Sequence, residues 1–198
     1  SLNVFAKGLS PYLPLNMSPE VETQIERVIA LTPGAPLTRP YKASELKTRL
    51  TLLKDSHPVL VGRLGKYLDR YTQPYALTHG SVTASLKSGK DKTLVNQRNL
   101  SSDTAFTASL GTMTYLSPYA YVSSGFEYRE GDGVTHTNTH LGFGYEYAQI
   151  ELGYREHWFS PFNDSAMLVS THAKASPSIT LSNATPITDW NIRYELFY

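Results

Sequence analysis

The chain has 198 residues, a formal net charge of +1 and no cysteine. Near-neutral charge gives no electrostatic basis for binding nucleic acid, and the lack of thiols excludes disulfides, cysteine-ligated metal ions and a thiol nucleophile. No apolar run reaches the roughly 18 residues of a transmembrane helix.

Residues 1–73 form an N-terminal region with the hydrophobic period of α-helices. A helix is predicted to begin at Ser18-Pro19-Glu20, where a capping serine, an N-terminal proline and an acidic first turn coincide, and to end at Thr32-Pro33-Gly34. A second helix is predicted over about 43–54 and a third from His57-Pro58 onward. Three short amphipathic helices must bury their apolar stripes, most simply against one another.

Over residues 74–198 the period changes to two, as in β-strands. Apolar and polar residues alternate most clearly over 140–147, 149–159 and 190–198. Shorter alternating segments and turn signals complete the pattern, the segments at 82–86, 106–110 and 122–128 and the turns at Ser88-Gly89, Ser117-Pro118, Gly131-Asp132-Gly133, Asn163-Asp164 and Asn183. We expect about eight or nine strands in this region.

Alternation alone also fits a soluble β-sandwich that carries helices. Three details favour a transmembrane β-barrel instead. Aromatic residues lie near strand ends on the apolar face, as interfacial girdles require, and tyrosine is frequent, with 14 residues against 7 Phe and 2 Trp. The opposite face is polar, as a wet lumen allows, and several strands approach the roughly ten residues that cross a tilted bilayer. The predicted fold class is therefore an antiparallel all-β transmembrane barrel preceded by a small helical region.

Short motifs occur in both regions of the chain. Those of the N-terminal region are Leu9-Ser10-Pro11-Tyr12-Leu13-Pro14-Leu15, then residues 19–27 and 37–40. Those of the strand region begin with Gly153-Tyr154-Arg155-Glu156-His157-Trp158-Phe159-Ser160-Pro161 and continue through 170–173 and 177–183. Together these motifs resemble the Wzi family of outer-membrane capsule assembly proteins, and the resemblance covers nearly the whole chain.

The resemblance implies that the chain is the N-terminal part of a larger, many-stranded barrel with its helices on the periplasmic side. It also implies a location in the Gram-negative outer membrane after removal of a signal peptide. The implied function is non-enzymatic: lectin-like binding that attaches or assembles capsular or related exopolysaccharide at the cell surface. The implied partners are the polysaccharide, outer-membrane lipid and other components of polysaccharide export, with no cofactor.

Arg155 and His157 are candidate polysaccharide-binding residues, because both face the lumen if the apolar side of their strand faces lipid. A guanidinium can bind the carboxylate of an acidic sugar through two hydrogen bonds. The alternative for Arg155 is an ion pair inside the barrel, with Glu151 or Glu146 as its partner.

Trp158, Asn163 and Asp164 complete the candidate binding residues. An aromatic ring beside amide and carboxylate groups suits sugar rings, which bind by stacking and by directional hydrogen bonds. The alternative for Trp158 is a position in an interfacial girdle before a tight turn, and the two roles are compatible.

Other functions are less well supported by the sequence. His157 and Asp164 lie near serines, but no Gly-x-Ser-x-Gly elbow of a hydrolase is present. His136 and His140 would lie about 13 Å apart on a strand, which is too far for one metal ion. We therefore predict no catalytic residue and no metal site. A transport channel through the lumen is the alternative function, and the helices could plug that lumen or dock in the periplasm.

Overall fold

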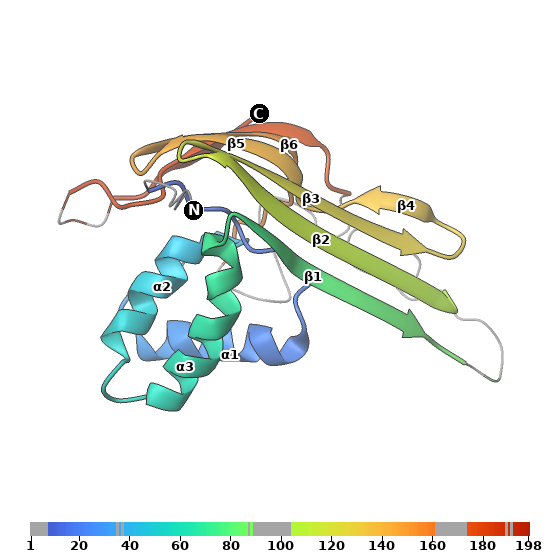
Figure 1. Cartoon of the computed structure of the whole chain (residues 1–198), viewed down its shortest axis with the longest axis horizontal. Coiled ribbons are helices and arrows are strands. Elements are labelled where there is room, and N and C mark those ends of the chain that lie inside the picture. The colour runs from blue at the N-terminus through green and yellow to red at the C-terminus, as the bar shows by residue number, and fades with distance from the viewer. Residues whose placement is uncertain are drawn as a thin grey trace.

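The computed structural model describes residues 8–34, 36, 38–86, 88, 104–160, 174–188, 190 and 192–198. In these ranges three α-helices precede an antiparallel sheet of eight strands, and the helices lie against one face of that sheet (Figure 1). The prediction of a β-rich chain with helices at its N-terminal side is confirmed at this level. None of the described helices has the length and apolar character that crossing a membrane requires.

The three helices begin close to their predicted positions. α1 covers Pro19–Leu31, α2 covers Ala43–Leu52 and α3 covers Pro58–Leu68, and the 3-10 helix η1 follows at Asp69–Thr72. Proline starts α1 and α3 because the first residue of a helix has no intrahelical amide hydrogen bond to lose. α2 ends before its predicted position, because residues 53–56 form the turn that leads into α3.

The sheet is built mainly from strands that follow one another along the chain. Its strands are β1 (Tyr75–Ala84), β2 (Phe106–Ser117), β3 (Ala120–Arg129), β4 (Gly133–His136), β5 (Thr139–Tyr145), β6 (Ala148–Tyr154), β7 (Pro177–Ser182) and β8 (Glu195–Phe197). The order across the sheet is β1-β2-β3-β5-β6-β7-β8, and β4 pairs with β3. Within the described sheet, the end strands β1 and β8 each pair on one side only.

β4 and β5 form one strand that a bulge interrupts opposite β3. The register against β3 shifts by one residue between the two segments. Asn138, in the bulge, has a φ angle of 51°, in the left-handed region that asparagine tolerates better than most residues. A Cβ at Gly125 would lie 1.9 Å from the carbonyl oxygen of Thr137 in the bulge, so only glycine fits there.

The strand predicted over 149–159 is shorter than expected. It corresponds to β6, which ends at Tyr154. Beyond that residue the chain pairs with the N-terminal region, because the backbones of Trp158 and Arg39 exchange hydrogen bonds of 2.7 and 3.0 Å in an isolated antiparallel bridge. The hydrophobic pattern continues past the end of β6, but there the backbone hydrogen-bonds to the N-terminal region instead of to the sheet.

The strand predicted over 190–198 is reduced to β8. Ile192 pairs with Ile187 in a separate antiparallel bridge, so the chain before β8 folds back on itself. Asn183 stabilises this connection, since its side-chain amide donates to two backbone carbonyls and accepts a 2.9 Å hydrogen bond from the amide of Tyr194. Asparagine often satisfies the backbone of a turn in this way.

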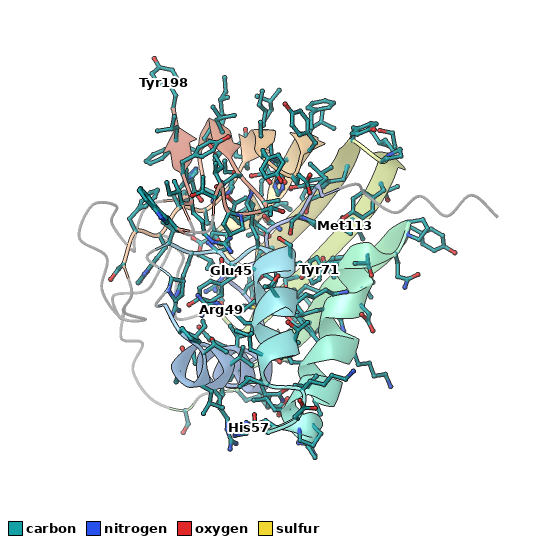
Figure 2. All side chains as sticks on the ribbon, turned by 90° about the vertical axis from the view of Figure 1, so that its left-hand side faces the viewer. Glu45, Arg49, His57, Tyr71, Met113 and Tyr198 are labelled. Carbon is teal, nitrogen blue, oxygen red and sulfur yellow. The ribbon has the colours of Figure 1, made fainter. Side chains whose placement is uncertain are left out.

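The apolar core lies between the helices and the inner face of β2 and β3. It combines helix residues with inward-facing strand residues, among them Ile25, Val28, Leu46, Leu64, Leu68, Met113 and Tyr121. Tyr71 and Met113 lie between the helices and the sheet (Figure 2). Tyr115 of β2 also donates a 3.0 Å hydrogen bond to the carbonyl of Tyr71 in η1. The helical region and the sheet therefore share one core.

The outer face of the sheet, turned away from the helices, is exposed and apolar (Figure 2). Along β6, Ile150 and Leu152 on this face are 44% and 40% exposed, whereas Gln149 and Glu151 on the inner face are 0% and 1% exposed. The pattern extends across the sheet, and further exposed apolar residues on the outer face include Leu77, Val82, Leu110, Phe126, Phe143, Ile179 and Leu196. A soluble one-sided sheet buries its apolar face and exposes its polar face, so β5 to β8 of this sheet are inverted, while the inner face of β2 and β3 contributes to the apolar core.

Candidate functional site

The polar inner face of β5 to β8 is the richest cluster of charged and hydrogen-bonding groups in the described residues. The strand alternation directs every second side chain inward, and the N-terminal segment 8–14 and the chain around α2 lie against them. We call this cluster the inner-face network. Its fully or nearly buried members include Tyr12, Lys42, His140, Gln149, Glu151, Arg155, Thr180 and Ser182.

Gln149 fixes the N-terminal segment to the sheet. Its side-chain amide accepts a 3.0 Å hydrogen bond from the amide of Ser10 and donates a 3.0 Å hydrogen bond to the carbonyl of Ser10. The hydroxyl of Ser10 accepts a 2.8 Å hydrogen bond from the amide of Ser44, in the first turn of α2. One residue of the segment thus satisfies both the sheet and a helix end, which would otherwise hold unpaired buried groups.

Arg155 joins two buried carboxylates at the centre of the inner-face network. Its guanidinium donates to Glu151 at 3.3 Å and to Glu195 at 2.6 Å, and the side chain of Arg155 is 1% exposed. The guanidinium also lies 3.6 Å from the ring centroid of Tyr12, in a cation–π contact. Buried charges require such paired and hydrogen-bonded surroundings.

Two further phenols satisfy these carboxylates. Tyr12 donates a 2.9 Å hydrogen bond to the second oxygen of Glu195, and Tyr121 donates to Glu151. Burial raises the pKa of Tyr12 well above its ordinary value, although Arg155 acts in the opposite direction. Tyr12 is therefore a neutral hydrogen-bond donor in this network over the physiological pH range.

Lys42 is the least fully paired cation of the network. Its ammonium donates a 2.9 Å hydrogen bond to Ser182 and lies 4.8 Å from the ring centroid of Tyr12. Burial lowers the pKa of Lys42 from 10.5 to about 8, because Glu151 and Glu195 only partly offset the loss of water. The charged form of Lys42 is thus held in place at neutral pH at a cost in free energy.

The structure places three of the five predicted binding residues. Arg155 and His157 meet at Glu195, where a ring nitrogen of His157 lies 3.6 Å from the carboxylate. The other ring nitrogen of His157 lies 3.1 Å from the hydroxyl of Ser178. Trp158 is 8% exposed, so its indole has little surface for stacking on a sugar.

Asn163 and Asp164 lie outside the described residues. The interior ion pair considered for Arg155 is present with Glu151, and Glu195 is a second partner that the sequence did not indicate. The sequence also did not single out Tyr12 or Lys42 as site residues, because the segments that carry them, before α1 and before α2, have no hydrophobic period that would reveal which side chains point inward.

The described residues contain no group of three or more histidine, cysteine or acidic side chains that could hold a metal ion. His136 stacks on Tyr154 with ring centroids 4.8 Å apart, and His140 is buried at 3.1 Å from the hydroxyl of Tyr121. Most donors and acceptors of the network pair with one another, an arrangement suited to holding segments together, although Nε of Arg155, Nδ1 of His140 and the hydroxyl of Thr180 are buried without a hydrogen-bond partner.

Comparison of the chain with protein-family models, curated proteins and solved structures gave no match. The function is therefore inferred from the chain's own residues and their geometry.

Proposed function

We propose that the chain forms part of an outer-membrane β-barrel protein that holds an exported polysaccharide at the cell surface without catalysing a reaction. The observation that carries the proposal is the sheet with an apolar outer face throughout and, over β5 to β8, a polar face packed inward. A lipid environment for the outer face and a packed interior for the inner face account for both halves of that observation.

Transfer to lipid would remove the unfavourable hydration of the outer face. Fully burying one large aliphatic or aromatic side chain stabilises by about 1.5–3 kcal/mol, and apolar patches of more than a few hundred Å² are rare on soluble monomers. Exposed tyrosines cluster where β1 begins and at the β2–β3 and β5–β6 turns, namely Tyr75, Tyr119, Tyr145 and Tyr147. At the opposite end of the sheet, Phe106 and Tyr128 lie on the outer face with ring centroids 6.2 Å apart. Two aromatic rows that flank an aliphatic band support membrane insertion.

Strand lengths also support a membrane-spanning sheet. β1 and β3 have 10 residues and β2 has 12, against the roughly 9–11 residues that a tilted strand needs to cross a bilayer. Lipid cannot satisfy the backbone of an open sheet edge. The proposal therefore requires further strands beside β1 and β8, as in a larger barrel.

Contacts between the two groups of Wzi-like motifs support the polysaccharide role. Tyr12 lies against Arg155, and Arg39 pairs with Trp158 through the backbone. Motifs that are more than a hundred residues apart in the sequence thus meet in one cluster. In this proposal Arg155, His157 and Trp158 shape the cluster, because their burial leaves little surface for a polymer, while Asn163 and Asp164 keep their predicted binding role.

The packed inner face argues against the alternative of a transport channel. Gln149, Glu151 and Thr180 are at most 1% exposed, and the N-terminal segment lies across them. A conducting pore would need a water-filled path along these side chains. The described part of the inner face leaves none at this position.

Extraction of membranes tests the location. Cells that express the chain within its complete protein should retain it in outer membranes after washing with concentrated urea, whereas a peripheral or soluble protein would be released. A soluble periplasmic protein serves as the matched control. Complete release of the chain by urea would contradict membrane insertion.

Loss of the gene tests the polysaccharide role. A deletion strain should shed polymer into the medium and carry less of it on the cell, and the wild-type gene should restore the attached fraction. Unchanged cell-attached polymer with none shed would refute this role. Steady single-channel conductance of the purified protein in planar bilayers would instead favour the channel.

A further inference from the structure

A cavity of about 340 Å³ lies beside the inner-face network and shares Tyr12, Lys42 and Glu195 with it. It is bounded by the chain after α1, the first turns of α2 and the connection that precedes β8. Its polar walls include Lys42, Glu45, Arg49, Arg193 and Glu195. The volume is at the lower end of the roughly 300–1,000 Å³ typical of small-molecule sites, which suits one sugar-sized group.

The charged groups of the cavity differ in how far the protein already satisfies them. Arg49 donates to Glu45, to the hydroxyl of Thr32 and to two backbone carbonyls, so it serves the fold (Figure 2 labels Glu45 and Arg49 on α2). Arg193 has one charged contact among the described residues, to Glu45 at 3.7 Å, and its side chain is 31% exposed. A guanidinium has five N–H donors, so Arg193, which lines the cavity, retains unused donors among the described contacts.

Lys42 is a second cation with unused hydrogen-bond donors. An ammonium has three donors, and Lys42 uses one of them on Ser182 within the described residues. Three cations face two carboxylates around the cavity, so its walls carry a net positive charge. Tyr194 adds a ring to the wall, with its hydroxyl held by a 2.7 Å hydrogen bond to the carbonyl of Tyr147.

We propose that this cavity binds one carboxylate-bearing sugar residue, with its carboxylate between Lys42 and Arg193 and its ring against Tyr194. The inference rests on the proposed function, which supplies the sugar. The chemistry of that sugar is inferred from the cavity. A carboxylate supplies the missing negative charge, and the sugar hydroxyls and C–H face match the polar and aromatic walls. The sugar could be a free uronic acid or a residue of an acidic polymer.

The electrostatics of Lys42 give the site a pH dependence. Burial lowers the pKa of Lys42 to about 8; Glu151 and Glu195 raise it, and Arg155 and Arg193 lower it further. A bound carboxylate favours the charged ammonium, so above pH 8 binding must be coupled to proton uptake. Affinity for the acidic sugar is therefore full at pH 7 and falls as the pH rises through 8 and beyond.

Calorimetric titration of the full protein in detergent tests the proposal, with D-glucuronate as the probe and D-glucose as the neutral control. At pH 7 glucuronate should bind at least about tenfold more tightly than glucose. Arg193→Gln should weaken glucuronate binding about tenfold or more, because it removes a charge-assisted hydrogen bond from a partly exposed position. The matched control Arg63→Gln, on the exposed side of α3, should leave binding unchanged.

Equal binding of glucose and glucuronate, full affinity in Arg193→Gln, or no binding at all would each overturn the proposal. If a glucuronate trisaccharide binds as well as the monomer, the natural ligand is a residue of an acidic polymer. If the trisaccharide does not bind, the natural ligand is the free acid. Missing glucuronate binding together with intact polymer retention on cells would overturn this site alone. Glucuronate binding without polymer retention would overturn the proposed function alone.

Discussion

Over β5 to β8, the two faces of the sheet reverse the arrangement of an ordinary soluble protein. Gln149 and Glu151 of β6 are buried on the inner face, and Ile150 and Leu152 between and beside them are exposed on the outer face. Polarity alone therefore does not decide which side chains are buried here. What decides it is what packs against each face: the N-terminal segment satisfies the inner polar groups, and none of the described residues covers the outer apolar ones.

The two faces gain their stability from different interactions. The inner face gains from paired charges and hydrogen bonds, which are costly to break one at a time. Under the proposed function the outer face gains stability from contact with lipid, so substitutions on this face should change the stability only in a membrane. Each face can be tested by a substitution that leaves the other intact.

The largest expected effect is at the centre of the inner face. Arg155→Met leaves Glu151 and Glu195 buried without their shared cation and should destabilise the fold by about 3–5 kcal/mol. Chemical unfolding in detergent, followed by circular dichroism, measures the change. Arg63→Met on the exposed side of α3 is the matched control and should shift stability by less than about 0.5 kcal/mol. Similar values for the two variants would show that the inner pairing contributes little.

A smaller effect is expected on the outer face. Ile150→Arg places a charge on the proposed lipid-facing band and should cost up to about 2–4 kcal/mol, the range for a charge at the middle of a bilayer. The matched control is Leu52→Arg on α2, where the side chain is already 64% exposed and should tolerate the charge. Folding yield into lipid vesicles separates the two variants. Equal yields would contradict lipid contact at Ile150.

The sequence predicted much of the fold because local signals were strong. The helix start at Ser18-Pro19-Glu20 and the stop at Thr32-Pro33-Gly34 agree with α1, since prolines and glycines act on the backbone directly. The strand extents after Tyr154 and before Glu195 were too long. After Tyr154 the alternation persists while backbone pairing with Arg39 replaces the sheet, and no local pattern reports a partner more than a hundred residues away. Before Glu195 the chain folds back on itself, and Ile192 pairs with Ile187 instead of with the sheet.

The site was less predictable than the fold. Glu151 was foreseen as a partner of Arg155 because both lie on one face of the same segment. Tyr12 and Lys42 were not, since they reach the network from two irregular segments, one before α1 and one before α2, whose side-chain directions follow from tertiary packing alone. Burial of Trp158 was likewise invisible in the sequence, because an aromatic residue suits a core, an interface and a sugar platform equally.

A third test uses pH and concerns Lys42, the least fully paired cation of the inner-face network. The pKa of Lys42 is about 8 in the folded state and 10.5 in the unfolded state, so the unfolded chain binds more protons between these values. Stability contributed by Lys42 is therefore lowest below pH 8 and rises by about 2 kcal/mol between pH 7 and 10. Unfolding free energies measured across this range should show the rise.

Lys42→Met isolates that effect, because other groups also titrate at high pH. The variant should lack the rise and should be more stable than the wild type at pH 7, where the buried charge is costly. Burial raises the pKa of Tyr12 and Tyr71 above 10, so their neutral phenols contribute stability below pH 10 that is lost above it. A rise of equal size in the wild type and in Lys42→Met would contradict the assignment to Lys42.

The smallest expected effect concerns a solvent-exposed ion pair, which can be compared with the buried ion pairs of Arg155. Lys47 and Asp69 lie 3.0 Å apart between α2 and η1, but their side chains are 32% and 65% exposed. Asp69→Asn should cost at most about 1 kcal/mol and progressively less as salt is added, because water and ions screen exposed charges. Arg155→Met should keep most of its cost at high salt, since no solvent reaches Glu151. If both variants responded alike to salt, the inner face would be accessible to water and the contrast between the faces would fail.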